Sequence, residues 1–168
     1  GVGMYAQTGT DASASAGALR DKADSLYNAQ LYDEAKAAAL EGLGRLKDST
    51  QHHRVAKTDS ETLGDLLNLL AIIGIRQGHF DEAAGYARQC NELDLSGGDP
   101  DMISSSYNTL AAIYMSMRQP KEAEKYILKA LSYAEDADNP ERKAVLNGIA
   151  SEVYHHMGQE EQSLDYAT

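Results

Sequence analysis

The sequence has little of what disulfide, metal and membrane sites require. Its 168 residues include one cysteine, one phenylalanine and no tryptophan. With Cys90 alone, no disulfide can form within the chain and no multi-cysteine zinc site can be built, although the cellular compartment stays open. No apolar run approaches the roughly 20 residues of a membrane span.

Positive charge is also scarce. The chain has 15 lysines and arginines against 26 acidic residues, which gives a net charge of −11. Proteins that bind nucleic acid or an anionic membrane surface need clustered cations to displace counterions, so the charge argues against both kinds of partner. The hydrophobic content of 42% is ordinary for a soluble globular protein.

The first residues give one indication of location. Val2 to Ala6, followed by Gln7, resembles the tail of a secretory signal peptide cleaved after Ala6, with Gly1 as a tag scar. We therefore expect residues 1–10 to be a flexible segment and the protein to be periplasmic or otherwise exported. The alternative is a cytoplasmic chain with an arbitrary flexible start.

The sequence repeats with a period of 40 residues. The stretch GHFDEAAGYARQC, residues 78–90, lies over RQPKEAEKYILKA, residues 118–130, when it is shifted by 40 positions. The residues before it keep the same register, since Asn68 matches Asn108. An earlier copy, LYDEAKAAALEG at residues 31–42, precedes it by 48 positions, with the extra residues in a polar loop. A regular repeat of this length is typical of solenoid proteins.

Each repeat begins with a helix-capping residue and has a break in its middle. Asp or Asn stands at the start of all four copies, where its side-chain oxygen can accept an orphan backbone N–H. Proline follows in two copies, at a position where its missing N–H is tolerated, and three of the breaks contain Gly or Pro. No segment alternates as a strand does. With caps at Asp11, Asp59, Asp99 and Asn139, the pattern predicts first helices near 12–29, 60–77, 100–117 and 140–157, and second helices near 33–48, 81–95, 121–136 and from about 160.

These helix–turn–helix units resemble the tetratricopeptide repeat, which has small and large apolar residues at fixed places. In the second copy the small residues are Ala71, Ala83 and Cys90, and the large ones include Leu70 and Phe80. Small residues let two helices approach closely, and neighbouring units must stack because none buries its apolar faces alone. The 40-residue period exceeds the usual 34 and resembles a long-helix variant, as in the N-terminal sensor-type regions of bacterial sensor kinases and regulators.

The resemblance implies the fold and its organisation. We expect an all-α protein, a right-handed superhelical array of antiparallel helix pairs with about four repeats. Residues 11–168 would form a single domain with units at about 11–50, 59–98, 99–138 and a truncated 139–168. Because the last unit lacks a polar closing helix, we expect the chain to be part of a longer protein or to pair its end with another chain.

The resemblance also implies a binding site. In tetratricopeptide arrays the first helices line a groove that suits an extended peptide or a helix. The stacked Asn68 and Asn108 could hold a peptide backbone; the alternative is that they are polar residues on a solvated face. The implied groove residues are Tyr27, Asn28, Asn68, Ile72, Arg76, Asn108, Met115, Glu152 and His155, and the wider lining also includes Arg20, Asp24, Asp65, Ile75, Ser105, Ala112, Ser116 and His156.

Catalytic and metal sites are not predicted. Cys90 takes a small apolar position, and His79 lies in a turn without a second ligand nearby. His155 and His156 are adjacent on a helix and cannot chelate as an i, i+4 pair would, and His52–His53 lie in a long polar loop, so solvated surface is expected for both pairs. No phosphate-loop, dinucleotide, nucleophile-elbow or metalloprotease fingerprint occurs. We therefore expect no enzyme activity, no cofactor and no metal.

The sequence thus predicts a non-enzymatic module that binds a protein or peptide, with no nucleic-acid partner and no membrane segment in this chain. On the resemblance, it would be the extracytoplasmic sensory or dimerising region of a larger bacterial signalling protein, with a homodimer kept open. The alternative is a stand-alone scaffold or assembly protein without a signalling role. Fold-level resemblance gives weak support for either function.

Overall fold

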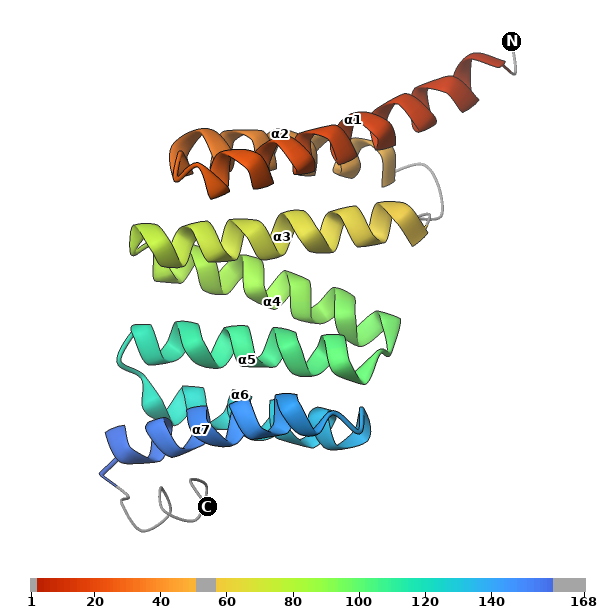
Figure 1. Cartoon of the computed structure of the whole chain (residues 1–168). Coiled ribbons are helices and arrows are strands. Elements are labelled where there is room, and N and C mark those ends of the chain that lie inside the picture. Colours follow the sequence, from red (N-terminus) through yellow and green to blue (C-terminus); the bar gives the residue numbers. More distant parts are fainter. Residues whose placement is uncertain (1–2, 51–56, 159–168) are drawn as a thin grey trace. The chain divides into compact units, whose positions relative to one another are not determined.

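The computed structural model describes residues 3–50 and 57–158, with side chains described at 15–47 and 57–158. The described residues form seven α-helices and no strand, which confirms the predicted all-α class. None of these helices is both long and apolar enough to cross a membrane. The helices are α1 (Gly3–Asn28), α2 (Tyr32–Thr50), α3 (Lys57–Gln77), α4 (Phe80–Gly97), α5 (Pro100–Ser116), α6 (Pro120–Asp136) and α7 (Pro140–His156) (Figure 1). The helix predicted from about residue 160 lies outside the described residues.

The caps predicted at the start of α5 and α7 are present. The Asp99 side chain accepts hydrogen bonds from the backbone N–H of Asp101 at 2.9 Å and of Met102 at 3.4 Å. Asn139 accepts one from the backbone N–H of Arg142 at 3.0 Å. Each cap is followed by a proline, whose ring would clash with a helical turn before it, so the helix cannot extend further upstream.

The first two predicted caps differ from the observed helix starts. α1 begins at Gly3, so the segment predicted to be flexible is helical from that residue on, and Asp11 lies inside the helix. α3 begins at Lys57, which places Asp59 in its first turn. Neither aspartate is followed by proline, and without that block a helix can continue upstream past a capping residue.

The turn inside each repeat has a left-handed residue at the same register. Gly78, Arg118 and Gly158 stand 40 positions apart with φ of 76°, 57° and 72°, and Gln30 with φ of 63° is the counterpart in the first copy. Glycine adopts this conformation freely, whereas a residue with a Cβ is disfavoured there by roughly 1–2 kcal/mol. Arg118 and Gln30 therefore hold a small backbone strain that Gly78 and Gly158 avoid.

The chain forms two compact units, Gly1–Gly78 and His79–Thr168, whose boundary falls inside the predicted repeat 59–98. In the first unit, α2 packs against α1 and α3, and α1 also contacts α3. Their close approach depends on Gly42, because a Cβ there would lie 3.2 Å from Leu66 and 3.3 Å from Leu19. A small residue at this register is what the repeat pattern requires.

In the second unit, α5 packs against α4 and α6, and α7 packs against α6. Small residues let these helices approach closely, and four of them have no exposed surface: Ala111, Ala123, Ala130 and Ala150. Large apolar side chains fill the space between the helices, and those fully buried include Leu110, Ile113, Ile127, Leu146 and Val153. Cys90 departs from the pattern, because it is half-buried where the sequence predicts a buried small residue.

Candidate functional site

The implied groove residues of the first unit lie on α1 and α3 and all reach solvent. Tyr27 and Ile72 are half-buried, and Asn28, Asn68 and Arg76 are exposed. The structure brings two of them together, because Arg76 Nε donates to the Tyr27 hydroxyl at 3.3 Å. This bond also raises the pKa of the Arg76 guanidinium. Asn28 and Asn68, on the same two helices, form no side-chain hydrogen bond with the described residues.

Acidic groups gather beside these residues in the first unit. Arg20 donates to Asp21 at 2.9 Å and to Asp65 at 3.2 Å, and its pKa is raised chiefly by the hydrogen bond to Asp21. Burial raises the pKa of the Asp24 carboxyl, and the charge of Asp65 adds to this effect. One guanidinium therefore faces three carboxyls, so this part of α1 and α3 is net acidic.

The implied groove residues of the second unit lie on α5 and α7. Asn108 and Met115 on α5 are half-buried, and Glu152 and His155 on α7 are exposed. The Asn108 side chain forms no hydrogen bond with the described residues, and its Oδ1 atom is buried without a partner. A buried polar atom left unpaired is unfavourable by roughly 1–3 kcal/mol, so Asn108 is a polar group whose partner is not within the described part of the chain.

A hydrogen-bonded network holds the first turns of α5 and α7 together. The Arg142 guanidinium donates two hydrogen bonds to the Asp101 carboxylate, from Nε to Oδ1 at 2.7 Å and from Nη2 to Oδ2 at 3.1 Å. Asn139 Nδ2 adds a bond to Asp101 Oδ1 at 2.9 Å. The hydrogen bond from Arg142 is the main reason that the pKa of Asp101 is lowered. Two helices 40 residues apart in sequence are thereby fixed side by side.

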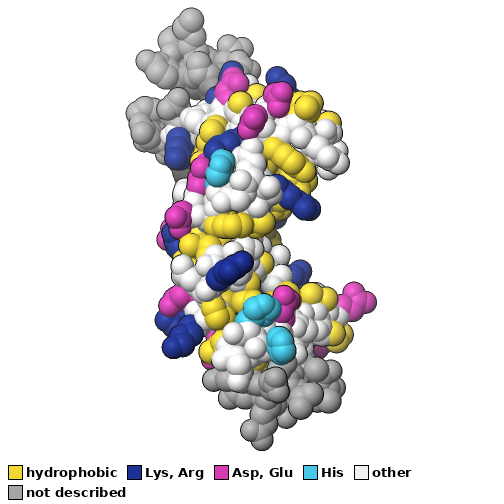
Figure 2. Space-filling view, turned by 90° about the vertical axis from the view of Figure 1, so that its left-hand side faces the viewer, with side chains coloured by type: hydrophobic (Ala, Val, Ile, Leu, Met, Phe, Trp, Pro, Cys, Tyr) yellow, Lys and Arg dark blue, Asp and Glu magenta, His cyan; other side chains and the backbone are white. Residues whose placement is uncertain are grey.

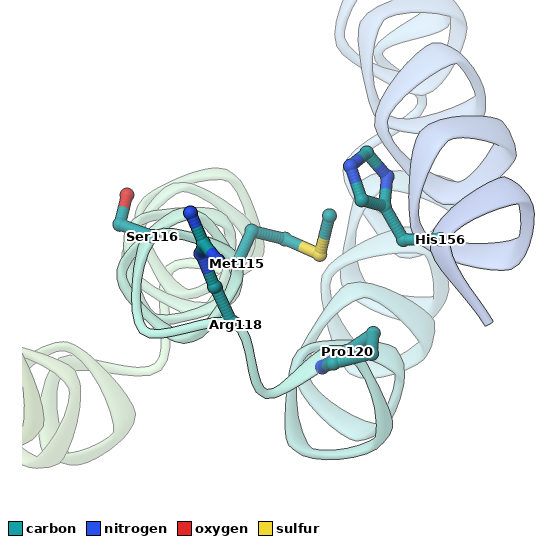
Figure 3. A pocket seen from close by; sticks show the side chains of 5 residues that line it. All are labelled: Met115, Ser116, Arg118, Pro120 and His156. Carbon is teal, nitrogen blue, oxygen red and sulfur yellow. The ribbon is translucent and has the colours of Figure 1, made fainter.

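A pocket of about 490 Å³ lies at the other ends of α5 and α7. The described residues that line it are Met115, Ser116, Arg118, Pro120 and His156. In Figure 3 the side chains of Met115 and His156 point toward each other across the pocket, and Arg118 rises beside Met115 from the turn between α5 and α6. Figure 2 looks onto these helix ends and shows exposed histidine side chains beside hydrophobic surface. His156 lines the pocket, whereas its neighbour His155 is not among the lining residues.

Four tyrosines of α5 and α6 form a stack that the sequence analysis did not single out. Tyr114 lies 5.3 Å from Tyr126, Tyr126 lies 6.2 Å from Tyr107, and Tyr107 lies 5.8 Å from Tyr133, measured between ring centroids. Arg88 of α4 donates to the Tyr114 hydroxyl at 2.7 Å. The seven-residue spacing within each pair, 107 to 114 and 126 to 133, was the available signal.

The histidines and the cysteine considered from the sequence do not form a metal site within the described part of the chain. His79 lies at the N-terminus of α4 and is exposed, without forming a side-chain cap. Cys90, on α4, is the one cysteine of the sequence. Within residues 3–50 and 57–158, no group of three or more His, Cys, Asp or Glu side chains could hold a metal ion. His52 and His53 fall outside the described residues.

A buried polar cluster joins α4 to α5 and includes an acid without a cation beside it. Asn91 Nδ2 donates to Ser106 Oγ at 3.0 Å, and Ser106 donates to the Ile103 carbonyl at 3.1 Å. Asp94 is buried next to them. Burial raises the pKa of its carboxyl and the charge of Asp99 contributes, while the nearby polar side chain of Ser106 opposes the rise.

This cluster predicts a pH-dependent stability. Since the folded state raises the pKa of Asp94 above its ordinary 3.8, stability should fall as pH rises from about 4 through the raised value. Asp94→Asn should therefore stabilise the chain at pH 7, by about 1 kcal/mol or roughly 2–4 °C in Tm, with the gain vanishing near pH 4. Thermal unfolding between pH 4 and 8 tests this. Glu92→Gln, an exposed acid on the same helix, is the control; an equal gain at all pH values would contradict the burial argument.

Comparison with known proteins agrees with this geometry. Residues 104–136 match the model of the tetratricopeptide repeat family. The chain is similar to the crystal structure of the apo form of RapI, with a TM-score of 0.81 and 13% identity over 93% of this chain and 41% of RapI. It is also similar to BtubC from P. vanneervenii, with a TM-score of 0.68 and 21% identity over 98% of this chain and 72% of BtubC. For the MamA protein the TM-score is 0.52 and the identity 13%, over 90% of this chain and 87% of MamA. No curated protein sequence matches the chain.

The fold and the comparisons define the class of protein: it is an all-α helical repeat array. More specifically, one repeat, residues 104–136, matches the tetratricopeptide repeat model directly. The chain spans 41% of the length of RapI, and at identities of 13–21% the likeness concerns the fold. Repeats of this type generally serve as scaffolds for protein–protein interaction. The class of function is therefore an interaction module.

Proposed function

We propose that the chain binds an extended peptide segment of a partner protein along the solvent-facing side of α5 and α7. The observation that carries this proposal is Asn108, whose half-buried carboxamide has no partner among the described residues. A carboxamide offers two donors and one acceptor, which is the complement of a peptide group. A peptide backbone passing along α5 would satisfy it.

The surface around Asn108 suits such a ligand. The exposed stripe of α5 consists of Met102, Ser105, Ala112 and Ser116, none of which is charged. On a chain of net charge −11, an uncharged stripe of small side chains allows a backbone to approach without desolvating an ion. On α7, the helix fixed beside α5 by Arg142, the exposed side carries Val145 and Gly148 and then the charged Glu152 at the register of Ala112. The rival interpretation is a solvated polar face, and it predicts that no ligand docks there.

Blocking the stripe tests the proposal. A peptide that binds the chain would be selected from a random peptide display library, and its affinity measured by fluorescence polarisation. Ala112→Trp places a large ring on the exposed side of α5 and should weaken binding at least about 10-fold, since a buried contact is worth about 1.4 kcal/mol or more.

The matched control is Leu128→Trp, which puts the same ring on the exposed side of α6 and should change affinity less than about 2-fold. If the α6 substitution abolished binding and the α5 substitution did not, the peptide site would lie on the second helices. If the library yielded no binder in repeated selections, the solvated-face interpretation would hold.

The wider role is also a proposal. The signal-like residues Val2 to Ala6 support an exported location, and the family resemblance supports a sensory or dimerising region within a larger bacterial signalling protein. Fractionating cells that express the parent protein tests the location, and light scattering of the purified chain tests the homodimer. A parent protein found in the cytoplasm with no signalling region would favour the scaffold alternative.

A further inference from the structure

The pocket between the ends of α5 and α7 has a positive lining on a strongly acidic chain. Its described lining contains Arg118 and His156 but no carboxylate, although acidic residues outnumber basic ones by 26 to 15 over the sequence. Met115 and Pro120 form apolar walls, which reduce the screening of a charge held between them. The pocket is therefore locally cationic and partly dry.

The guanidinium of Arg118 differs from those of the other arginines in the described part of the chain, because it engages no side chain or backbone group there. The others all have partners: Arg20, Arg45 and Arg142 bind carboxylates, and Arg76 and Arg88 bind tyrosine hydroxyls. An unpaired guanidinium presents five N–H donors in a planar fork that fits a carboxylate. At Arg118 this capacity is unused within the described part of the chain.

The backbone at Arg118 gives a second, independent observation. Arg118 has φ of 57° at a register where Gly78 and Gly158 stand in the neighbouring repeats. The turn itself would be more relaxed with glycine, although Gln30 shows that the turn also accepts a longer side chain. Strained residues of this kind concentrate at functional sites. The side chain, which lines the pocket, is what arginine adds over glycine.

His156 is oriented to contribute a polar group to the same pocket. Its Nδ1 atom lies 2.9 Å from the Glu152 carbonyl oxygen, an acceptor, so Nδ1 carries the hydrogen. Nε2 is then the ring nitrogen left for a ligand, and Figure 3 shows the ring directed toward the space opposite Met115. Ser116 is less available, because its hydroxyl donates to the Ala112 carbonyl at 3.0 Å.

We propose that this pocket receives an aspartate or glutamate side chain of the bound peptide, with Arg118 as its ionic partner and His156 as a polar contact. The inference rests on the proposed peptide-binding function and adds the chemistry of one partner residue. A carboxylate fits better than a phosphate, because one guanidinium balances one negative charge, whereas a phosphate dianion needs several cations and would be repelled more strongly by a chain of net charge −11.

A titration followed by NMR tests this without the unidentified peptide. The ¹⁵N-labelled chain is titrated with N-acetyl-glutamate α-amide and, separately, with N-acetyl-glutamine α-amide at constant ionic strength. Saturable shifts of the signals from residues 115–120 and of the His156 ring are expected with the glutamate compound only. Equal shifts with both compounds, or shifts elsewhere alone, would overturn the proposal. Inorganic phosphate is the third ligand in the titration. If phosphate bound about 10-fold tighter than the glutamate compound, the proposed partner residue would be a phosphorylated one and not an aspartate or glutamate.

Variants of Arg118 separate binding from folding. Arg118→Gly should abolish the glutamate-specific shifts while leaving Tm unchanged or raised by roughly 2 °C, since glycine relieves the left-handed strain. Arg118→Lys should retain part of the response. The control is Gln30→Gly, which relieves the same strain in the first unit and should leave the response intact. Glutamate-specific shifts that survive in Arg118→Gly would exclude Arg118 as the ionic partner.

The carboxylate pocket and the peptide path along α5 are separate proposals, and different results would contradict each of them. Display-selected peptides that bind α5 without any acidic residue, and without sensitivity to Arg118→Gly, would keep the proposed function and overturn the pocket. Glutamate-specific binding at the pocket, together with an unaffected Ala112→Trp variant, would keep the pocket and overturn the peptide path along α5.

Discussion

Replacement of Tyr107 by alanine is expected to lower the free energy of unfolding by about 3–5 kcal/mol, as truncation of a large buried aromatic side chain does. Tyr107 is only 7% exposed and stands in the middle of the tyrosine stack, with Tyr126 and Tyr133 on α6 as neighbours. Lys129 adds a cation over its ring at 5.4 Å. Removing the ring would leave a cavity and break both stacked pairs together. The loss of unfolding free energy should therefore exceed that from removing a tyrosine at either end of the stack.

Urea unfolding followed by circular dichroism measures this loss. Tyr107→Phe keeps the ring and removes only the hydroxyl, so it should cost about 1 kcal/mol or less. Burial raises the pKa of the Tyr107 hydroxyl above its ordinary value of 10.0. A loss below about 1 kcal/mol for the alanine variant would mean that α5 and α6 do not depend on this stack.

The sequence could predict the helices of the second unit closely because local chemistry fixes their ends. Asp99 and Asn139 each precede a proline, so capping and the proline block act at the same residue. The predicted starts of α5 and α7 are therefore confirmed. Asp11 and Asp59 are capping residues that no proline follows, and the observed helices begin upstream of both. A capping residue alone does not stop a helix whose preceding residues can also be helical.

The candidate site could be predicted in part, and the missing part depends on three-dimensional arrangement. The groove residues of α5 and α7 reach solvent as the repeat register requires, but their role in binding stays a prediction. The register assigned Arg118 to a turn, and only its backbone angle and the pocket beside it indicate another role. His155 and His156 differ by about 100° around a helix, and the repeat register alone does not distinguish the one that lines the pocket.

Asn108→Ala is expected to weaken binding of a display-selected peptide about 30-fold and to leave the chain as stable as before or more so. In the free chain Oδ1 of Asn108 is buried without a partner, so its removal takes away an unfavourable group, worth up to about 1 kcal/mol. In the complex the carboxamide would exchange two hydrogen bonds with a peptide group, and losing both at about 1 kcal/mol each gives the expected factor. Fluorescence polarisation and thermal unfolding of the same samples measure the two effects.

The opposite signs of these two effects distinguish a binding residue from a structural one. A residue that only supported the fold would lose stability and affinity together. Asn147 on α7 is the matched control, because it is also a half-buried asparagine but stands outside the implied groove positions, and its alanine variant should change affinity less than about 2-fold. If Asn108→Ala bound as tightly as the unmodified chain, the unpaired amide would have no role in recognition. The peptide path along α5 would then depend on Ala112 and the uncharged stripe alone.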